Sequence, residues 1–142
     1  YIAHCKHCLY REPVQGLAGS IPDVCPVCGE KLIGIGPLWI GPIQNREFIE
    51  SMIEIADEKD LNTKKQVLKL LNLCKDEADA PLSYYNIHDM CRVLKISAPK
   101  YEKIIEHLRE KGFTAAKTHY NPIGIKTNAS NTELMDILKE MQ

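Results

Sequence analysis

The sequence has no long apolar run, few aromatic residues and almost no net charge. No apolar stretch approaches the roughly 20 residues of a membrane-spanning helix, so we expect no membrane segment. The formal net charge of −1 gives no overall attraction to nucleic acid, so any such role has to rest on local charge. An apolar content of 44% is typical of a globular protein. The length of 142 residues is enough for one domain or two small ones.

Cysteine, in contrast, is concentrated near the N-terminus. Cys5 and Cys8 form one Cys-x-x-Cys pair and Cys25 and Cys28 a second, with sixteen residues between the pairs. A two-residue gap lets both thiolates of a pair face one ion, and two such pairs complete a tetrahedral zinc site. Gly29 can supply the positive φ that such turns often need after the second ligand. Because four thiolates leave no coordination position open, we expect a structural Zn²⁺ ion rather than a catalytic one.

Other interpretations of the cysteine pairs stay open at this point. Two disulfides are disfavoured because no signal peptide is visible and Cys74 and Cys91 lie in helical patterns, which together indicate a reducing, cytoplasmic compartment. A redox dithiol is disfavoured because such motifs normally open a helix after a strand, and neither pair does. His4 and His7 are additional candidate ligands beside the first pair.

The pattern predicts an α+β, mostly helical fold with three consecutive regions. Residues 1–36 carry the cysteine pairs and a short strand at 32–35, which indicates a small zinc ribbon. Residues 37–60 begin with a turn-forming segment around Trp39 and continue as a helix over 46–59. We expect Trp39 to be a hydrophobic plug that docks the ribbon on the next element, with base stacking as the alternative. The acidic face of the helix would repel phosphate.

Residues 61–142 show the order helix, helix, turn, helix, hairpin, which is that of a winged helix. The helix over 97–111 would be the reading helix, the hairpin over 113–127 its wing, and a last helix follows. The predicted caps and turns are Thr63 with Gln66, Asn86, Ser97 with Pro99, Gly112, the Asn121-Pro122 turn, and Ser130 with Glu133.

Charge distinguishes the reading helix from the hairpin. The reading helix mixes lysine and arginine with Glu102, Glu106 and Glu110, so it is poorly suited to binding phosphate. The hairpin lies in a stretch without any acidic residue between Glu110 and Glu133. We therefore expect any RNA contact to lie on the hairpin, with domain packing as the alternative role. The candidate RNA-binding residues are Lys111, Lys117, Thr118, His119, Asn121 and Lys126.

Two stretches of the sequence resemble one known family. They are Gly36-Pro37-Leu38-Trp39-Ile40-Gly41-Pro42, directly after the cysteine pairs, and Thr118-His119-Tyr120-Asn121-Pro122-Ile123-Gly124-Ile125-Lys126-Thr127-Asn128-Ala129. In this order, with the cysteine pairs, they are similar to the C-terminal half of tRNA (guanine-26, N2)-dimethyltransferases of the archaeal type. The resemblance covers nearly the whole chain.

The resemblance implies an enzyme that transfers methyl groups from S-adenosylmethionine to one tRNA guanine. The cofactor and the catalytic residues would belong to a Rossmann-like N-terminal half, because this chain has no glycine-rich strand-turn-helix unit and no Asp-Pro-type catalytic loop. The implied partners are tRNA and that N-terminal methyltransferase domain. Cys5, Cys8, Cys25 and Cys28 match the zinc cysteines of the family, whereas Asn128 stands where the family often has Asp.

Two hypotheses from different classes follow. The first is the RNA-binding and structural part of a tRNA methyltransferase, without catalytic residues of its own. The first residue, Tyr1, fits a fragment of a longer protein. The second is a stand-alone zinc-ribbon and winged-helix regulator, which would bind duplexes sequence-specifically with a steep salt dependence. The mixed charge of the reading helix disfavours the second.

Overall fold

The computed structural model describes all 142 residues and has the predicted α+β, mostly helical composition. None of its helices is long and apolar enough to cross a membrane. The elements, in chain order, are β1 (Ile2–His4), β2 (Arg11–Pro13), a 3-10 turn (Ala18–Ser20), β3 (Ile33–Ile35), α1 (Arg46–Glu58), α2 (Lys64–Glu77), β4 (Tyr85–Asn86), α3 (Ile87–Leu94), α4 (Tyr101–Glu110), β5 (Ala115–Lys117), β6 (Gly124–Thr127) and α5 (Asn131–Glu140).

The chain divides into two compact units, each built from separate segments. The first unit contains Tyr1–Gly41, His88–Pro99 and Ala129–Gln142, and the second contains Pro42–Ile87 and Lys100–Asn128. This grouping differs from the three consecutive regions predicted from the sequence, because segments distant in the chain fold together. The predicted order of helices and hairpin is present, whereas the winged-helix arrangement itself stays a prediction.

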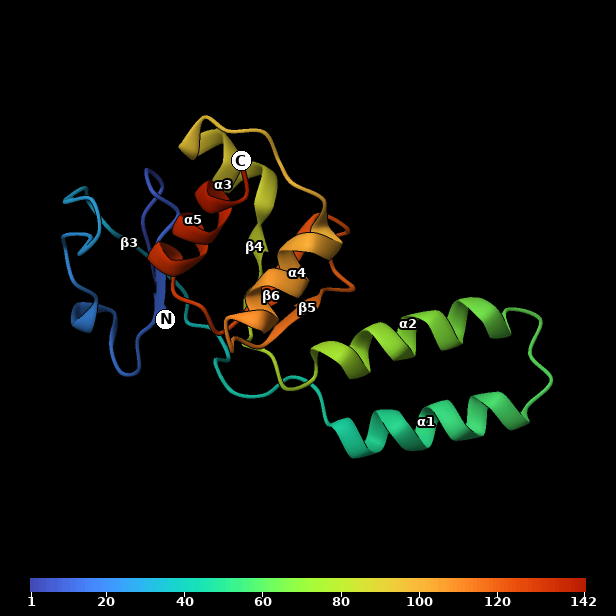
Figure 1. Ribbon diagram of the computed structural model, residues 1–142. Helices are drawn as coiled ribbons and strands as arrows, with labels where there is room; N and C mark the ends of the chain where they lie inside the picture. The colour runs from blue at the N-terminus through green and yellow to red at the C-terminus, as the bar shows by residue number, and fades with distance from the viewer. The chain divides into compact units, whose positions relative to one another are not determined.

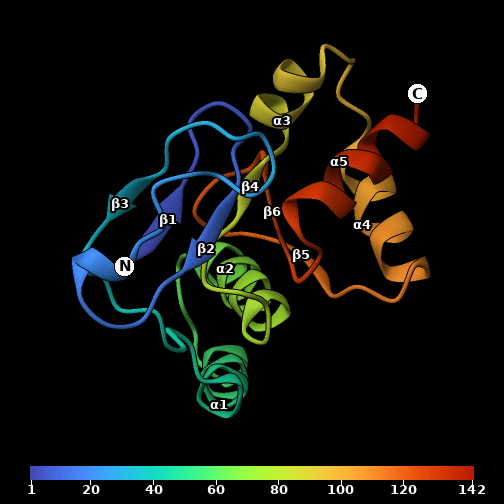
Figure 2. The ribbon, with the colours of Figure 1, turned by 90° about the vertical axis from the view of Figure 1, so that its left-hand side faces the viewer.

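The first unit contains a three-stranded antiparallel sheet in the order β2-β1-β3 (Figure 2). Ala3 of the central strand pairs with Glu12 on one side and with Gly34 on the other. A Cβ atom on Gly34 would lie 2.3 Å from Ile21 Cδ1, so a larger residue there would require the Ile21 side chain to move. Strands of three residues bury little surface. Buried cysteines therefore make up much of the core beside them.

Helix α5 of the first unit begins as the sequence predicted. The Ser130 side chain accepts from the Glu133 backbone N–H, and the Glu133 carboxylate accepts from the Ser130 backbone N–H. This capping box satisfies two backbone donors that the helix leaves unpaired. Leu134, Ile137 and Leu138 are buried, as expected from their spacing.

The second unit contains an antiparallel pair of helices, α1 and α2, that run side by side (Figure 1). Ile49 and Ala56 of α1 are buried in their shared core. Phe48, Met52 and Ile55, predicted to share the buried stripe, are instead exposed. The reason is that α1 has extensive contact with α2 alone, and one neighbouring helix covers a narrower stripe than the sequence offers.

A second antiparallel sheet, in the order β4-β6-β5, completes this unit. β5 and β6 form the predicted hairpin, with Ala116 opposite Lys126, and β4 adds a short third strand. Helix α4 buries Ile104 and Leu108, and Gly112 ends it with a φ of +86°, as predicted for a left-handed cap.

One predicted helix cap and one predicted helix start were wrong. Thr63 precedes α2, but its side chain makes no capping hydrogen bond, because its backbone (φ −111°, ψ 25°) lies outside the extended region that a capping residue adopts. Helix α4 begins at Tyr101 rather than after Ser97, since Lys100 is still extended with a ψ of 134°.

The prediction that Trp39 is a buried plug was also wrong within this chain. Its side chain is 69% exposed, although large rings are usually covered. The ring rests on Gly41, where an added Cβ would lie 2.5 Å from Trp39 Cζ2. The ring is therefore in close contact with its own turn.

Candidate metal centre and nucleic-acid interface

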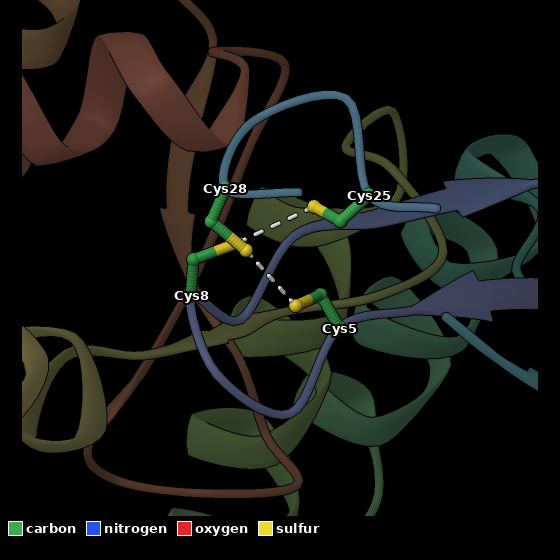
Figure 3. A group of neighbouring side chains, drawn as sticks. All are labelled: Cys5, Cys8, Cys25 and Cys28. Atoms are coloured by element: carbon green, nitrogen blue, oxygen red, sulfur yellow. Dashed lines mark hydrogen bonds between the residues drawn. The ribbon is translucent and has the colours of Figure 1, made fainter. Parts of the chain in front are cut away.

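The four N-terminal cysteines meet around one centre (Figure 3). The Sγ atoms of Cys5 and Cys28 are 3.5 Å apart, and those of Cys8 and Cys25 are 3.6 Å apart. All four lie within 4.8 Å of one another. Sulfur ligands of a tetrahedral zinc ion are about 3.8 Å apart, given Zn–S bonds of about 2.3 Å. The cluster therefore has the size and the donor set that one zinc ion requires.

The two Cys-x-x-Cys turns have the same backbone geometry. Leu9 N donates to Cys5 O at 2.9 Å, and Gly29 N donates to Cys25 O at 3.0 Å. The residue after each second cysteine has a positive φ, +62° at Leu9 and +77° at Gly29. Gly29 adopts this conformation as predicted. Leu9 adopts it against the preference of its residue type, so a positive φ at this position could not be predicted from the residue.

The ionisation of the cysteines is coupled through their proximity. Burial raises the pKa of Cys5, but hydrogen bonds from the Cys8 backbone and the Cys28 side chain outweigh it and lower the pKa to about 7. Burial raises the pKa of Cys8 well above its ordinary value. Without a cation, thiolates this close together oppose one another's ionisation. A divalent metal removes that conflict, because it binds the deprotonated form of each ligand.

The additional candidate ligands lie outside the cluster. His4 Nδ1 is 3.1 Å from the carbonyl oxygen of Tyr10, and His7 is exposed. Cys91 is buried and Cys74 is partly buried in the α1–α2 core, as expected of core thiols. None of the six cysteines is in a disulfide. The donor set of the candidate metal centre is therefore four sulfurs.

Asn131 contacts the cysteine cluster from the start of α5, a contact that no sequence pattern predicts. Its side chain is 2% exposed, and Nδ2 donates to the carbonyl oxygen of Cys8 at 3.2 Å. The two residues are 123 positions apart, so no local spacing could indicate the contact. The hydrogen bond fixes the backbone of one cysteine turn to a helix of the same unit.

In the second unit, the hairpin lysine expected to contact RNA is buried. Lys126 is 1% exposed, and its Nζ lies 3.1 Å from Oε2 of Glu77, whose carboxylate is fully buried at the end of α2. An ammonium group in this position cannot reach a phosphate. The prediction for Lys126 is therefore corrected: this lysine neutralises a carboxylate inside the protein.

His119 and Thr118 share the same buried carboxylate. Nδ1 of His119 pairs with Oε1 of Glu77, and the backbone N–H of His119 lies 3.3 Å from that oxygen. Burial raises the pKa of Glu77, but hydrogen bonds from His119, Thr118 and Lys126 outweigh it and hold the pKa below its ordinary value. Thr118 is buried as well. Buried Thr118 is not placed to bind phosphate, which corrects its assignment as an RNA contact, whereas the His119 side chain is 21% exposed and its assignment stays a prediction. We name this group the Glu77 network: Glu77, Thr118, His119 and Lys126.

The other three candidate RNA-binding residues lie nearer the surface. Lys117 is exposed, with Nζ 2.5 Å from Oε1 of Glu102. Lys111 is exposed at the end of α4. Asn121 is half-buried, and its Oδ1 accepts from the Ile123 backbone at 3.0 Å. The hairpin therefore provides accessible polar groups at its edges, while its centre is occupied by the Glu77 network.

Comparisons with known proteins identify one family. The family model described as N2,N2-dimethylguanosine tRNA methyltransferase matches residues 1–139. A protein of Methanobrevibacter smithii named tRNA (guanine(26)-N(2))-dimethyltransferase is 55% identical over 141 residues, which is 99% of this chain and 36% of that protein. One of the same name from Methanothermobacter thermautotrophicus is 41% identical over 138 residues, again 36% of its length. The chain thus spans about a third of the relatives it matches.

A solved structure shares the fold. It is described as a complex of Trm1 from Pyrococcus horikoshii with S-adenosyl-L-methionine, and it matches 97% of this chain with a TM-score of 0.79 and 33% sequence identity. The match covers 34% of that protein, so the similarity concerns one part of it.

Proposed function

The chain belongs to the N2,N2-dimethylguanosine tRNA methyltransferase family, and we propose that it is the tRNA-side region of a tRNA (guanine-26, N2)-dimethyltransferase. The observation that carries this proposal is the match of residues 1–139 to one family whose members are much longer than the chain. The proposed partners are tRNA and an N-terminal methyltransferase domain of the same protein, in the cytoplasm. S-adenosylmethionine would bind to that N-terminal domain.

The architecture supports this division of roles. Rossmann-like cofactor sites form at the carboxyl ends of parallel strands, beside a glycine-rich turn. Both sheets of this chain are antiparallel, and their strands have two to four residues. The chain therefore offers no such edge to a nucleotide cofactor, and methyl transfer is assigned to the other part of the protein.

We also propose that Cys5, Cys8, Cys25 and Cys28 hold one structural Zn²⁺ ion in a zinc ribbon. Four sulfur ligands fill a tetrahedral coordination sphere, so the ion would supply folding free energy and no reactive water. Structural zinc contributes about 10–16 kcal/mol in isolated zinc-finger peptides at neutral pH. A segment with strands of three residues needs such a contribution.

The proposed phosphate contacts are Lys111 and Lys117, with Asn121 as a polar neighbour. Both lysines are exposed and belong to the stretch without acidic residues between Glu110 and Glu133. The ion pair of Lys117 with Glu102 is exposed as well, and such pairs contribute about 0–1 kcal/mol. A phosphate group can therefore take the place of this carboxylate at little cost.

Photo-crosslinking of the full-length protein to its tRNA tests the proposal. We expect crosslinked peptides from the segment between α4 and β6, and no change when random duplex DNA competes. The stand-alone regulator, which family membership disfavours, requires that duplex DNA removes the crosslinks. Crosslinked peptides confined to the protein outside these 142 residues would contradict a tRNA-side role.

A further inference from the structure

Tyr120 is an exposed aromatic ring at the tip of the β5–β6 hairpin. Three aromatic side chains of the chain are strongly exposed: Trp39, Phe48 and Tyr120, the last with an exposed fraction of 59%. Phe48 lies on α1, between Glu47 and Glu50 on a strongly acidic helix. Tyr120 lies in the stretch without acidic residues between Glu110 and Glu133, and Trp39 lies in a shorter one between Glu30 and Glu47 that holds fewer lysines.

The Tyr120 ring is held in place although it is exposed. The His119 ring lies beside it, with 3.9 Å between the ring centroids and an interplanar angle of 36°. Nζ of Lys126 lies 5.9 Å from the ring centroid, within the range of a cation–π contact. The Tyr120 backbone N–H lies 3.3 Å from Oγ1 of Thr118. All three neighbours belong to the Glu77 network, so a buried carboxylate orders the surroundings of a surface ring.

The turn that carries Tyr120 is fixed as well. Oδ1 of Asn121 accepts from the Ile123 backbone at 3.0 Å, and Gly124 N donates to the Asn121 carbonyl at 2.9 Å. A Cβ atom on Gly124 would lie 2.6 Å from Thr118 Cγ2 and 2.7 Å from Tyr84 Cδ2, so the two sides of the hairpin approach as closely as glycine allows. A ring that is ordered before it binds loses less conformational entropy on binding.

A planar, accessible ring on a sequence stretch without acidic residues, whose Lys117 pairs with the exposed carboxylate of Glu102, has the chemistry to stack on a nucleobase. RNA recognition often uses bases splayed out from loops or bulges and stacked on aromatic side chains. Such stacking needs no hydrogen bond to the base edge and tolerates any base, because every base has a π-face. The exposed lysines at 111 and 117 supply positive charge along the same segment. Phe48 lacks this setting, since the carboxylates around it repel phosphate.

We infer that Tyr120 is a stacking platform for one unpaired base of tRNA, and that His119 positions it. The inference rests on the proposed function and adds the contact residue and the type of contact. The Glu77 network then acquires a role beyond stability, because it orders the ring that meets the RNA.

The test is tRNA affinity of the full-length protein carrying Tyr120→Ala, Tyr120→Phe or Phe48→Ala. Loss of one stacked base raises the dissociation constant by about 5- to 100-fold, and we expect this for Tyr120→Ala. Tyr120→Phe keeps the π-face and should stay within about twofold of the wild type. Phe48→Ala removes an equally exposed ring and should leave affinity unchanged. His119→Ala should weaken binding less than Tyr120→Ala.

Three results would overturn the inference. Unchanged affinity in Tyr120→Ala shows that no base stacks there. Equal losses in Tyr120→Phe and Tyr120→Ala show that the hydroxyl group, and not the ring, makes the contact. A crosslink from Tyr120 to another part of the full-length protein instead of tRNA shows that the ring is covered by the rest of the protein. In each case, tRNA crosslinks elsewhere within the 142 residues would still support the proposed tRNA-side role. If no residue of this chain crosslinks to tRNA, the proposed function is contradicted as well.

Discussion

The two buried polar clusters of this protein balance negative charge in different ways. In the first unit, the sulfurs of the four N-terminal cysteines surround one centre, and the side chains packed around them are largely apolar, such as Ala3 and Leu32. In the second unit, Glu77 has Lys126 at 3.1 Å and His119 beside it. Under the proposed zinc assignment, the first cluster takes an ion from outside the chain, whereas the second carries its own cation. Metal dependence should therefore be confined to one of them.

Replacing one of the four N-terminal cysteines should cause the largest loss of stability. Cys8→Ser removes one thiolate from the site and should abolish stoichiometric zinc binding, at a cost of up to about 10 kcal/mol of folding free energy in the cysteine segment. Metal analysis of the purified protein measures this. Cys91→Ala is the matched control, because it removes a buried thiol of the same unit outside the cluster and should keep one zinc ion per chain. Equal zinc content in both variants would contradict the assigned ligands.

Replacing Lys126, the cation of the Glu77 network, should have the second-largest effect. Lys126→Met leaves the carboxylate of Glu77 buried without its ammonium partner, which costs about 3–5 kcal/mol. The readout is the free energy of opening of α2 and β6, from amide exchange in denaturant. Adding Glu77→Gln should restore part of the loss, since the charge that lacks a partner is then gone. Lys117→Met breaks an exposed pair and should cost under about 1 kcal/mol. A Lys126 variant as stable as the Lys117 variant would argue against a buried ion pair.

Lowering the pH should destabilise the Glu77 network, because Glu77 becomes protonated. Its pKa in the folded protein lies below the ordinary value of 4.5, so its stabilising contribution is fully present above about pH 4.5. That contribution is lost as the pH falls through the folded-state pKa. Between pH 4.5 and lower values, the wild type should therefore lose more stability in α2 and β6 than Glu77→Gln does, as thermal melts at each pH would measure. Parallel pH profiles would show that Glu77 is not ionised in the folded state.

The smallest expected effect concerns the support of the cysteine turn. Asn131→Ala removes the hydrogen bond to the Cys8 carbonyl, which is worth about 1 kcal/mol. Zinc should then transfer to a chelator faster, while stoichiometry stays at one ion per chain. Asp136→Ala, on the exposed side of α5, is the control and should leave the transfer rate unchanged. An unchanged rate in Asn131→Ala would show that the cluster needs no support from α5.

The features that the sequence predicted well depend on neighbours within a few positions. The Cys-x-x-Cys spacing, the positive φ of Gly29 and the capping box of Ser130 with Glu133 each follow from local chemistry. The hairpin around Asn121 could be predicted equally well, because its turn residues are neighbours in the sequence. Identity with the family was visible in two short stretches for the same reason.

The features that it missed depend on partners far along the chain. The sequence pattern predicts that Lys126 is an exposed lysine of the hairpin, but in the fold Lys126 lies beside Glu77. Glu77 and His119, which belong to the same network, are 42 residues apart in the sequence. Trp39 was predicted to be buried because large rings usually are, yet it is 69% exposed. The contact of Asn131 with Cys8 has no sequence signal at all. Whether a charged side chain is buried depends on the tertiary fold, so the spacing of residues in the sequence does not predict it.

Amide hydrogen exchange with and without a strong chelator tests the central contrast most directly. It follows both clusters in one sample, through the amides of Leu9 and Gly29 in the first and the amides of α2 and β6 in the second. We expect chelation to speed exchange by orders of magnitude at Leu9 and Gly29, and to leave α2 and β6 unchanged. Loss of protection at both clusters together, or at neither, would contradict the account.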